Sequence, residues 1–139
     1  VQNLTLASSA VEEVLRYHNS TQYMHRTMTK DTTLHGCTLA EGDSVLLLIG
    51  AANHDEREFG STAGQFNIHR NPDRHLSFGY GAHFCLGAAL ARMEGKIAVE
   101  EIHRRIPDYE VNHDEKVRFH SGNVTGWTKL PIRFTPGRK

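Results

Sequence analysis

The sequence predicts a mixed fold of helices and small β-sheets, arranged as a single domain over residues 1–139. A chain of 139 residues is long enough for one compact domain and too short for two of ordinary size. Helical periodicity is confined to two segments, one near residue 10 and one after residue 85, while short extended pieces with turn signals fill much of the rest. Apolar residues make up 38% and charged residues 23%, so extensive disorder is not expected.

The first helix is predicted from about Ala10 to Tyr17. Ser9, followed three residues later by Glu12, is the pattern of a capping box at a helix N-terminus. Apolar residues follow with helical spacing at Val11, Val14 and Leu15.

The next segment, residues 22–49, reads as short strands in a small meander sheet. His35-Gly36 and Glu41-Gly42-Asp43 supply its turn signals. A helical turn is expected near residues 50–54. The stretch 55–75 then has no sustained period, which in a compact domain indicates a functional role or a misassigned element.

A long amphipathic helix is predicted to begin at Cys85 and to stop at Pro107. Its apolar face is predicted to belong to the core and contains Leu86, Leu90, Met93 and Ile97. Alternation in residues 115–120 and 130–134, separated by the turn-like segment 121–126, predicts a terminal hairpin.

Composition excludes several classes of function. Sixteen basic and sixteen acidic residues give no net charge, so nothing favours nucleic acid or an anionic membrane surface as a partner. The longest apolar run, residues 45–52, is too short to span a membrane, and the N-terminus lacks a signal pattern, so we expect a cytoplasmic protein. The ten histidines are scattered and form no ligand pair for zinc.

The segment 78–87 carries the chemistry. Its glycines permit a tight turn, and Cys85 stands where the long helix is predicted to start. The partial positive charge of a helix N-terminus favours the thiolate, which is the form that binds metal. The commoner alternative for an isolated cysteine is that it packs as a small apolar residue.

The neighbours of this cysteine decide between the two readings. Phe78, Gly81, Cys85 and Gly87 complete the pattern Phe-x-x-Gly-x-x-x-Cys-x-Gly, which resembles the cysteine loop of the cytochrome P450 superfamily of haem-thiolate monooxygenases. The resemblance implies that the chain folds as the C-terminal part of that fold. It also implies that haem b, iron protoporphyrin IX, is the cofactor and that Cys85 is the axial ligand of its iron.

The same resemblance assigns further cofactor-binding residues. Phe78 would shield the sulfur from water, Gly79 lies in the same loop, and backbone N–H groups near Leu86 and Gly87 would donate hydrogen bonds to the sulfur.

Two side chains outside these positions would pair with the haem propionates. His83 has the position of a propionate-binding histidine in soluble bacterial members, and Arg26 matches their strand arginine. The alternatives are that His83 is a solvated loop residue and Arg26 an ordinary surface arginine.

A second motif, Glu13-Val14-Leu15-Arg16, resembles the Glu-x-x-Arg helix of the family. Alone, such a pair is usually a solvated surface contact. The resemblance implies that Glu13 and Arg16 are buried and joined by Arg70 in a structural network that holds the aperiodic segment.

The resemblance covers nearly the whole chain but corresponds to roughly the last third of a family member. The distal half, with the central oxygen-activating helix, is expected to be absent, so no catalytic residue is assigned. The parent reaction would be oxygen-dependent hydroxylation of a lipophilic substrate, with electrons from a ferredoxin-type redox partner. Arg92 resembles a basic residue of the surface where such partners dock, and a solvated helix charge is its alternative.

Two interpretations of the short chain remain at this stage. It is either a fragment of a monooxygenase or a naturally short relative. The alternative function is a truncated, non-catalytic module that binds haem or a partner. Apolar surface left uncovered by the shorter chain would favour self-association.

Overall fold

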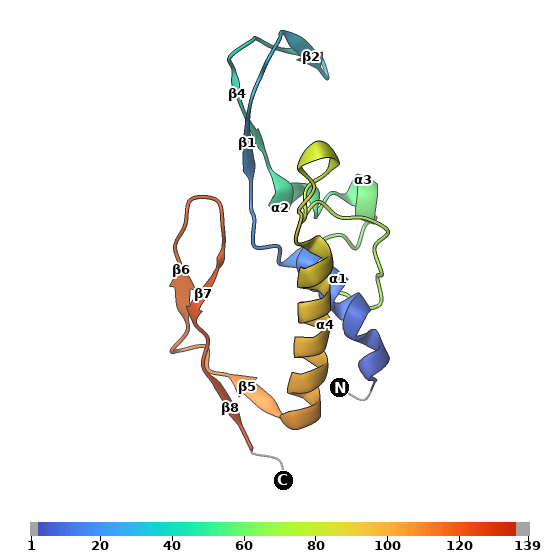
Figure 1. Ribbon diagram of the computed structural model, residues 1–139, viewed down its shortest axis with the longest axis vertical. Helices are drawn as coiled ribbons and strands as arrows, with labels where there is room; N and C mark the ends of the chain where they lie inside the picture. Colours follow the sequence, from blue (N-terminus) through green and yellow to red (C-terminus); the bar gives the residue numbers. More distant parts are fainter. Residues whose placement is uncertain (1–2, 136–139) are drawn as a thin grey trace.

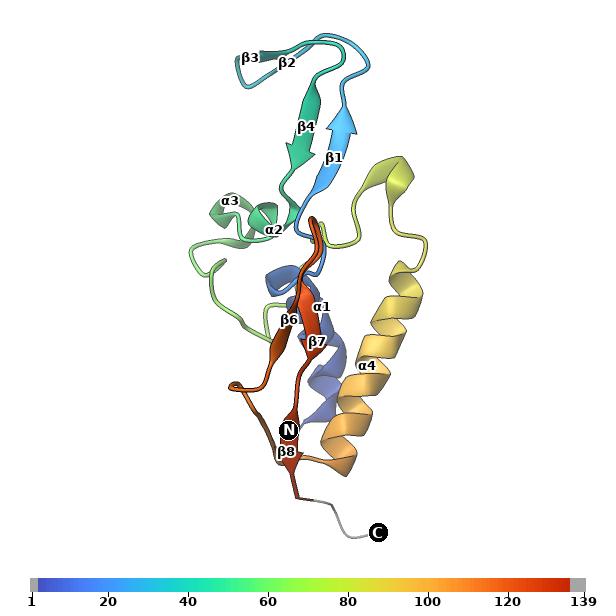
Figure 2. The same ribbon diagram turned by 90° about the vertical axis from the view of Figure 1, so that its left-hand side faces the viewer.

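The computed structural model describes residues 3–135 as an elongated molecule built around two helices (Figure 1). Helix α1 spans Ala7–Tyr17 and helix α4 spans Ala88–Arg105. They lie side by side in both views, with the strands of residues 24–47 extending from one end and the C-terminal strands running alongside (Figures 1 and 2).

Helix α1 begins three residues earlier than predicted, and the predicted capping box is wrong. A 3-10 turn, η1, covers Leu4–Leu6 and runs directly into α1. The side chain of Asn3 accepts a hydrogen bond from the Thr5 N–H at 3.0 Å, so the cap lies before η1. Ser9 lies within the helix, where its hydroxyl donates to the Ile68 carbonyl of the aperiodic segment.

The contact between α1 and α4 depends on a glycine. A Cβ atom built on Gly95 would lie 3.0 Å from Cγ1 and 3.3 Å from Cγ2 of Val11. Val11 is buried, and Ala88 is the buried residue of α4. The absence of a side chain at residue 95 therefore sets how closely the two helices approach.

Helix α4 starts three residues after Cys85, not at Cys85. The Cys85 N–H is already used by the Phe78 carbonyl at 2.8 Å, which holds Cys85 in the preceding loop. The Cys85 carbonyl accepts from the Ala88 N–H at 3.2 Å. The helix ends at Arg105, before Pro107, as the sequence predicts.

The segment 22–49 forms two nested hairpins instead of a meander. Strand β1 (Met24–Thr27) pairs with β4 (Ser44–Leu47), and between them β2 (Thr32–Leu34) pairs with β3 (Cys37–Leu39). Gly42 at φ 90 turns the chain back, and its N–H donates to the Met28 carbonyl at 2.9 Å. This contact returns β4 to β1 and not to β3.

Short helices lead from this arm into the aperiodic segment. Helix α2 spans Ile49–Ala52, close to the predicted helical turn, and α3 spans Glu56–Phe59. A 3-10 turn, η2, at Gly81–His83 is the only helical turn described between α3 and α4 within residues 3–135. Side-chain contacts must therefore hold the residues between 60 and 80.

The tail contains the predicted strands, but the pairing differs. Strand β6 (Val117–Phe119) pairs with β7 (Gly126–Lys129), and β5 (Tyr109–Val111) pairs with β8 (Ile132–Phe134). The predicted pairing of residues 115–120 with 130–134 is wrong, because β7 takes the place beside β6. The loop before β7 pairs back to an earlier loop through a bridge between Thr21 and Val124.

Burial contradicts the predicted role of the α4 apolar face. The buried apolar residues are few and mostly small, namely Ala7, Val11, Ile49, Ala63 and Ala88. Leu86 is fully exposed, and Leu90, Met93 and Ile97 are about half exposed (102%, 53%, 53% and 51%). This face points away from α1, and none of the described residues buries it. No helix among residues 3–135 is both long and apolar enough to cross a membrane.

Candidate cofactor site

The loop before α4 is folded tightly around two glycines. Gly79 and Gly81 have φ values of 73 and 71, in the left-handed region that favours glycine. The Gly79 N–H donates to the Leu76 carbonyl at 2.8 Å, and the Phe84 N–H donates to the Gly81 carbonyl at 3.0 Å. Together with the bond from Cys85 to Phe78, these contacts fix the loop that presents the cysteine.

This loop forms one wall of a cavity of about 560 Å³. The structure brings Phe78, Gly79, His83 and Cys85 together on this wall. Arg26, on strand β1, lines the same cavity. The other lining residues are Thr21, Met24, Leu47, Leu48, Ile49, Ala52, Leu76, Ser77 and Tyr80. Two residues of the predicted set, Leu86 and Gly87, do not line it.

The lining combines apolar side chains with one thiol and two side chains that can bind carboxylates. Most of its side chains are apolar, one thiol can bind a soft or borderline metal, and Arg26 and His83 can pair with carboxylates. Arg26 is exposed, and among residues 3–135 its guanidinium donates only to the neighbouring His25 carbonyl at 2.8 Å, which leaves donors for a bound group. An apolar, planar group that carries carboxylates and a thiolate-binding metal therefore fits these residues.

The other cysteine is placed elsewhere. Cys37 is an exposed, free thiol on β3 and is not part of the cavity lining. Cys85 is also free and exposed, but it lies among the apolar lining residues and beside Phe78. Within residues 3–135 no group of three or more His, Cys, Asp or Glu side chains could hold a metal ion.

The structure brings Glu13, Arg16 and Arg70 together in one network. Arg16 donates to both oxygens of Glu13, from Nε and from Nη2, each at 2.8 Å. Arg70 Nε donates to Glu13 Oε1 at 3.3 Å. The side chains of Glu13 and Arg16 are fully buried, and that of Arg70 is 11% exposed.

The remaining donors of the two arginines hold the aperiodic segment. Arg16 Nη1 donates to the carbonyls of Asn53 and Ala63 at 2.7 and 2.9 Å. Arg70 donates to the carbonyls of Phe59 and Thr62 at 3.0 and 2.6 Å. Side-chain donors thus replace the ladder hydrogen bonds that this segment lacks.

Glu13 is held as a carboxylate despite its burial. Desolvation by burial alone would raise its pKa, but hydrogen bonds from Arg16, from the Asn67 N–H at 2.8 Å and from Arg70 outweigh it. The pKa of Glu13 therefore lies below its ordinary value.

Several residues at the site were not predicted from the sequence. Asn53 is fully buried, where its Oδ1 accepts from the Leu76 N–H at 2.8 Å and its Nδ2 donates to the Ser77 hydroxyl at 2.9 Å. Glu12 and His75 form another contact at 3.0 Å. These partners are 23 to 63 residues apart, so no local sequence pattern indicates them.

Arg92 makes two contacts that the sequence did not indicate. Its guanidinium donates to Glu12 at 2.6 and 3.2 Å and lies over the Phe78 ring, 4.6 Å from the centroid. The side chain is 39% exposed. Arg92 is thus a partly exposed, ion-paired residue that lies behind the cysteine loop.

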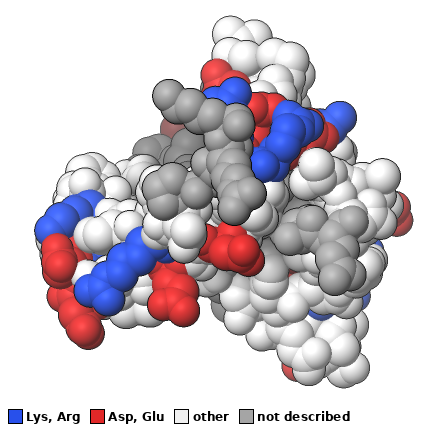
Figure 3. Space-filling model, turned by 90° about the horizontal axis from the view of Figure 1, so that it is seen from below, with Lys and Arg blue, Asp and Glu red and all other residues white. Residues whose placement is uncertain are grey.

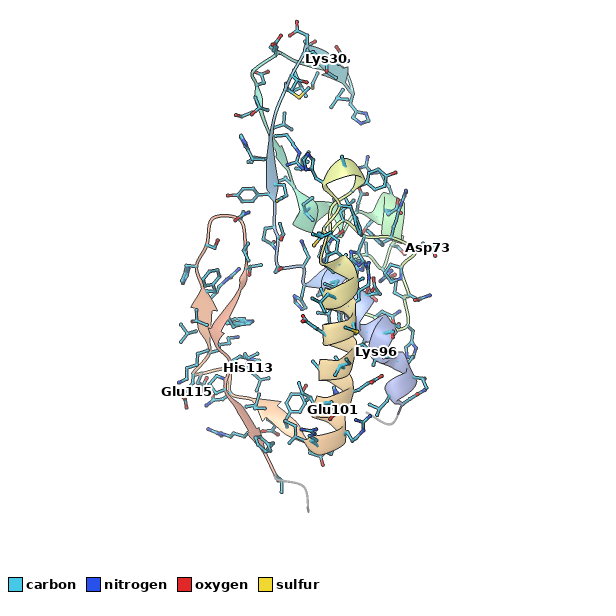
Figure 4. The ribbon with its side chains drawn as sticks, viewed as in Figure 1. Lys30, Asp73, Lys96, Glu101, His113 and Glu115 are labelled. Atoms are coloured by element: carbon cyan, nitrogen blue, oxygen red, sulfur yellow. The ribbon has the colours of Figure 1, made fainter. Side chains whose placement is uncertain are left out.

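Charges elsewhere are mixed. Figure 3 shows Lys and Arg beside Asp and Glu on the face seen from below. Along α4, ion pairs join Lys96 to Glu100 and Glu101 to both Arg104 and Arg105. Figure 4 shows Lys96 and Glu101 at successive levels of this helix.

Comparison with known sequences identifies similar proteins over almost the whole chain. The sequence model of the cytochrome P450 family matches residues 1–130. A steroid C26-monooxygenase of Mycolicibacterium smegmatis is 41% identical over 137 residues, which is 98% of this chain and 34% of that protein. Putative cytochrome P450 123 of Mycobacterium tuberculosis is 50% identical over 123 residues, 88% of this chain and 30% of that protein.

Solved structures of cytochromes P450 have the same fold over most of this chain. The crystal structure of P450BioI in complex with hexadec-9Z-enoic acid ligated acyl carrier protein has a TM-score of 0.90 at 39% identity, and covers 96% of this chain and 35% of that one. The structure of CYP109E1 from Bacillus megaterium in complex with testosterone has a TM-score of 0.89 at 39% identity, with coverage of 95% and 37%. The chain thus spans about one third of the length of the relatives that it matches.

Proposed function

The chain belongs to the cytochrome P450 family, and from this premise we propose that it is the haem-binding C-terminal segment of a soluble, bacterial-type monooxygenase. One observation carries the proposal. The described residues place the thiol of Cys85, the cationic Arg26 and His83 around one largely apolar cavity, and this combination suits haem b.

In this proposal Cys85 is the iron ligand. A thiolate at this position donates electron density to the metal, and the N–H groups of Leu86 and Gly87, between Cys85 and the start of α4, lie next to it in sequence. When bound, haem supplies the activation of molecular oxygen for insertion of one oxygen atom into a C–H bond.

The other residues position and shield the cofactor. Arg26 and His83 pair with its carboxylates, while Phe78 and Gly79 belong to the loop that presents the sulfur. The network of Glu13, Arg16 and Arg70 holds the segment that precedes the loop. No residue of this chain is assigned as a catalytic acid or base.

The substrate we propose is lipophilic. One similar protein of Mycobacterium tuberculosis is a methyl-branched lipid omega-hydroxylase, 44% identical over 131 residues, which is 94% of this chain and 30% of that protein. The apolar lining from Met24, Leu47 and Leu48 suits such a molecule. We further propose that electrons come from a ferredoxin-type redox partner and that the protein works in the cytoplasm.

A second candidate function is a non-catalytic module that binds haem or a partner. Exposed apolar residues favour it, because Leu86 just before α4 and Leu90, Met93 and Ile97 on α4 need a cover. In this case we expect the 139-residue chain to self-associate. Turnover with a redox system would decide for the enzyme.

The test of the proposal uses the two cysteines as a matched pair. We expect the reduced, carbon monoxide-bound form of the Cys37→Ser variant to show the red-shifted Soret band of a thiolate-ligated haem. The Cys85→Ser variant should lose this band. The reverse result, or a band that survives in both variants, would refute the assignment of Cys85.

A further inference from the structure

A second polar cluster lies next to the Glu13 network and uses the neighbouring glutamate. Glu12 Oε1 accepts from Arg92 Nε at 2.6 Å, and Glu12 Oε2 accepts from Arg92 Nη2 at 3.2 Å. The imidazole of His75 contacts Glu12 Oε2 through Nε2 at 3.0 Å. One carboxylate thus joins α1 to α4 and to the irregular segment before the cysteine loop.

The hydrogen bonds of His75 fix its protonation state. The Ser77 N–H donates to Nδ1 at 3.2 Å, so Nδ1 acts as an acceptor and Nε2 carries the hydrogen that is donated to Glu12. The side chain is only 1% exposed, and this burial lowers the pKa of His75. His75 is therefore a neutral donor that aligns the carboxylate of Glu12.

Arg92 transmits this alignment to the cysteine loop. Its guanidinium, held by both oxygens of Glu12, lies 4.6 Å from the centre of the Phe78 ring. A planar cation over an aromatic face stabilises one position of that ring. The Phe78 carbonyl in turn accepts from the Cys85 N–H at 2.8 Å, and both residues line the cavity.

We propose that Glu12 and His75 are positioning residues, which act through Arg92 and Phe78 to hold the loop that presents Cys85. We call this chain of contacts the Phe78 anchor; it runs from Glu12 through Arg92 and Phe78 to Cys85. The inference rests on the proposed role of Cys85 as the iron ligand. It assigns Arg92 to the support of the loop.

The first test needs no cofactor and follows backbone hydrogen exchange by mass spectrometry. In the Glu12→Gln and Arg92→Lys variants we expect exchange over residues 76–87 to rise at least about threefold, because local opening of the loop becomes easier. Exchange over β1 and β4 should stay unchanged. The control is Glu100→Gln. This variant removes the carboxylate from the Lys96–Glu100 ion pair, which lies on α4, like Arg92, but farther from the cysteine loop.

The Arg92→Lys variant separates charge from planar stacking. Lysine keeps a cation beside Glu12 but has no planar group to lie over Phe78. In a Phe78→Leu background, Arg92→Lys should therefore change loop exchange by less than about twofold, since the aromatic face is already absent. Equal effects of Arg92→Lys in both backgrounds would show that Arg92 does not act through Phe78.

The second readout is spectroscopic. In the haem-loaded chain we expect Glu12→Gln to lower the share of the carbon monoxide complex that shows the thiolate-type Soret band, and Glu100→Gln to leave it unchanged. If loop exchange in Glu12→Gln equals that of the wild type, or rises equally everywhere in the chain, the Phe78 anchor is refuted. If the wild type itself shows no thiolate band, the proposed ligation fails, whereas the exchange result still tests the anchor.

Discussion

At the scale of single residues, two adjacent glutamates on α1 have separate tasks. Glu13 points into the largely buried network with Arg16 and Arg70, while Glu12 contacts Arg92 and His75. Both carboxylates are held ionised by the groups around them. The stability of the loops on either side therefore depends on charges that are partly or wholly removed from water.

The Glu13 network is expected to act as one unit. Replacing Arg16 by Met should lower the free energy of unfolding by about 3–5 kcal/mol, because Glu13 would remain as a buried, poorly compensated charge. The double variant Glu13→Gln/Arg16→Met should lose less than the sum of the two single losses, with a coupling above about 0.5 kcal/mol. Chemical denaturation measures all three. Additive losses would mean that the charges are independent.

Stability should fall in acid in two separate ranges. Burial keeps the pKa of His75 below its ordinary value of 6.5, so the unfolded chain takes up a proton first as the pH falls below about 6.5, and stability is lost from there downward. The pKa of Glu13 also lies below its ordinary value of 4.5, so its contribution is complete above 4.5 and is lost as the pH falls through the lower folded value.

A variant separates the two ranges. In His75→Gln we expect the free energy of unfolding to be flatter just below pH 6.5, while the loss below 4.5 that comes from Glu13, which His75 does not contact, stays. Urea denaturation at a series of pH values gives this profile. An unchanged slope in the upper range would contradict the role given to His75.

At the scale of elements, the position of α4 depends on a close approach to α1. Gly95 lacks the Cβ atom that would lie 3.0 Å from Val11 Cγ1. The same contact explains why a glycine is found in the interior of an 18-residue helix, where it costs about 1 kcal/mol relative to alanine. The close packing of α4 against Val11 of α1 offsets the lower helix propensity of this glycine.

A pair of variants tests this contact. Gly95→Ala alone should leave the free energy of unfolding nearly unchanged or lower it, because the new methyl group meets the methyl groups of Val11. In a Val11→Ala background the same change should be more favourable by about 1 kcal/mol, since the propensity gain is then no longer opposed. Thermal or urea unfolding compares the two. Equal effects in both backgrounds would show that Gly95 is not limited by Val11.

At the scale of the whole molecule, the cavity is open on one side. Among its lining residues Leu47, Leu48 and Tyr80 are 40%, 57% and 85% exposed, and the apolar face of α4 is exposed as well. The described residues therefore supply the wall that carries the thiol, without enclosing a bound group.

This openness predicts poor coupling by the 139-residue chain alone. Where water reaches the reacting centre, electrons are lost to reduced oxygen species and fewer are used for hydroxylation. With a competent redox system and a panel of lipophilic substrates, we expect hydrogen peroxide or superoxide to account for most of the electrons consumed. Efficient formation of hydroxylated product per electron would show that these residues suffice, and would contradict the prediction.

Local sequence patterns predicted the main helices, the short strands and the glycine turns of the cysteine loop. Glycines at 79 and 81 allow the left-handed turns before Cys85, and the spacing around the cysteine led to the family that the comparisons show. The Glu13–Arg16 pair also follows from spacing, because residues three apart share a face of a helix. These features depend on neighbours in the chain, which a single sequence displays.

Strand pairing and burial were decided by the tertiary structure. The patterns placed strands near residues 117–119 and 132–134 but could not show that each pairs with a different strand, because a strand's partner depends on contacts across the chain. The α4 stripe was predicted to be core, yet Leu86 is fully exposed. Periodicity indicates that a face is apolar, whereas burial requires another element to cover it. Likewise, only folding brings Glu12 to Arg92, 80 positions away, and so places a charge behind the cysteine loop.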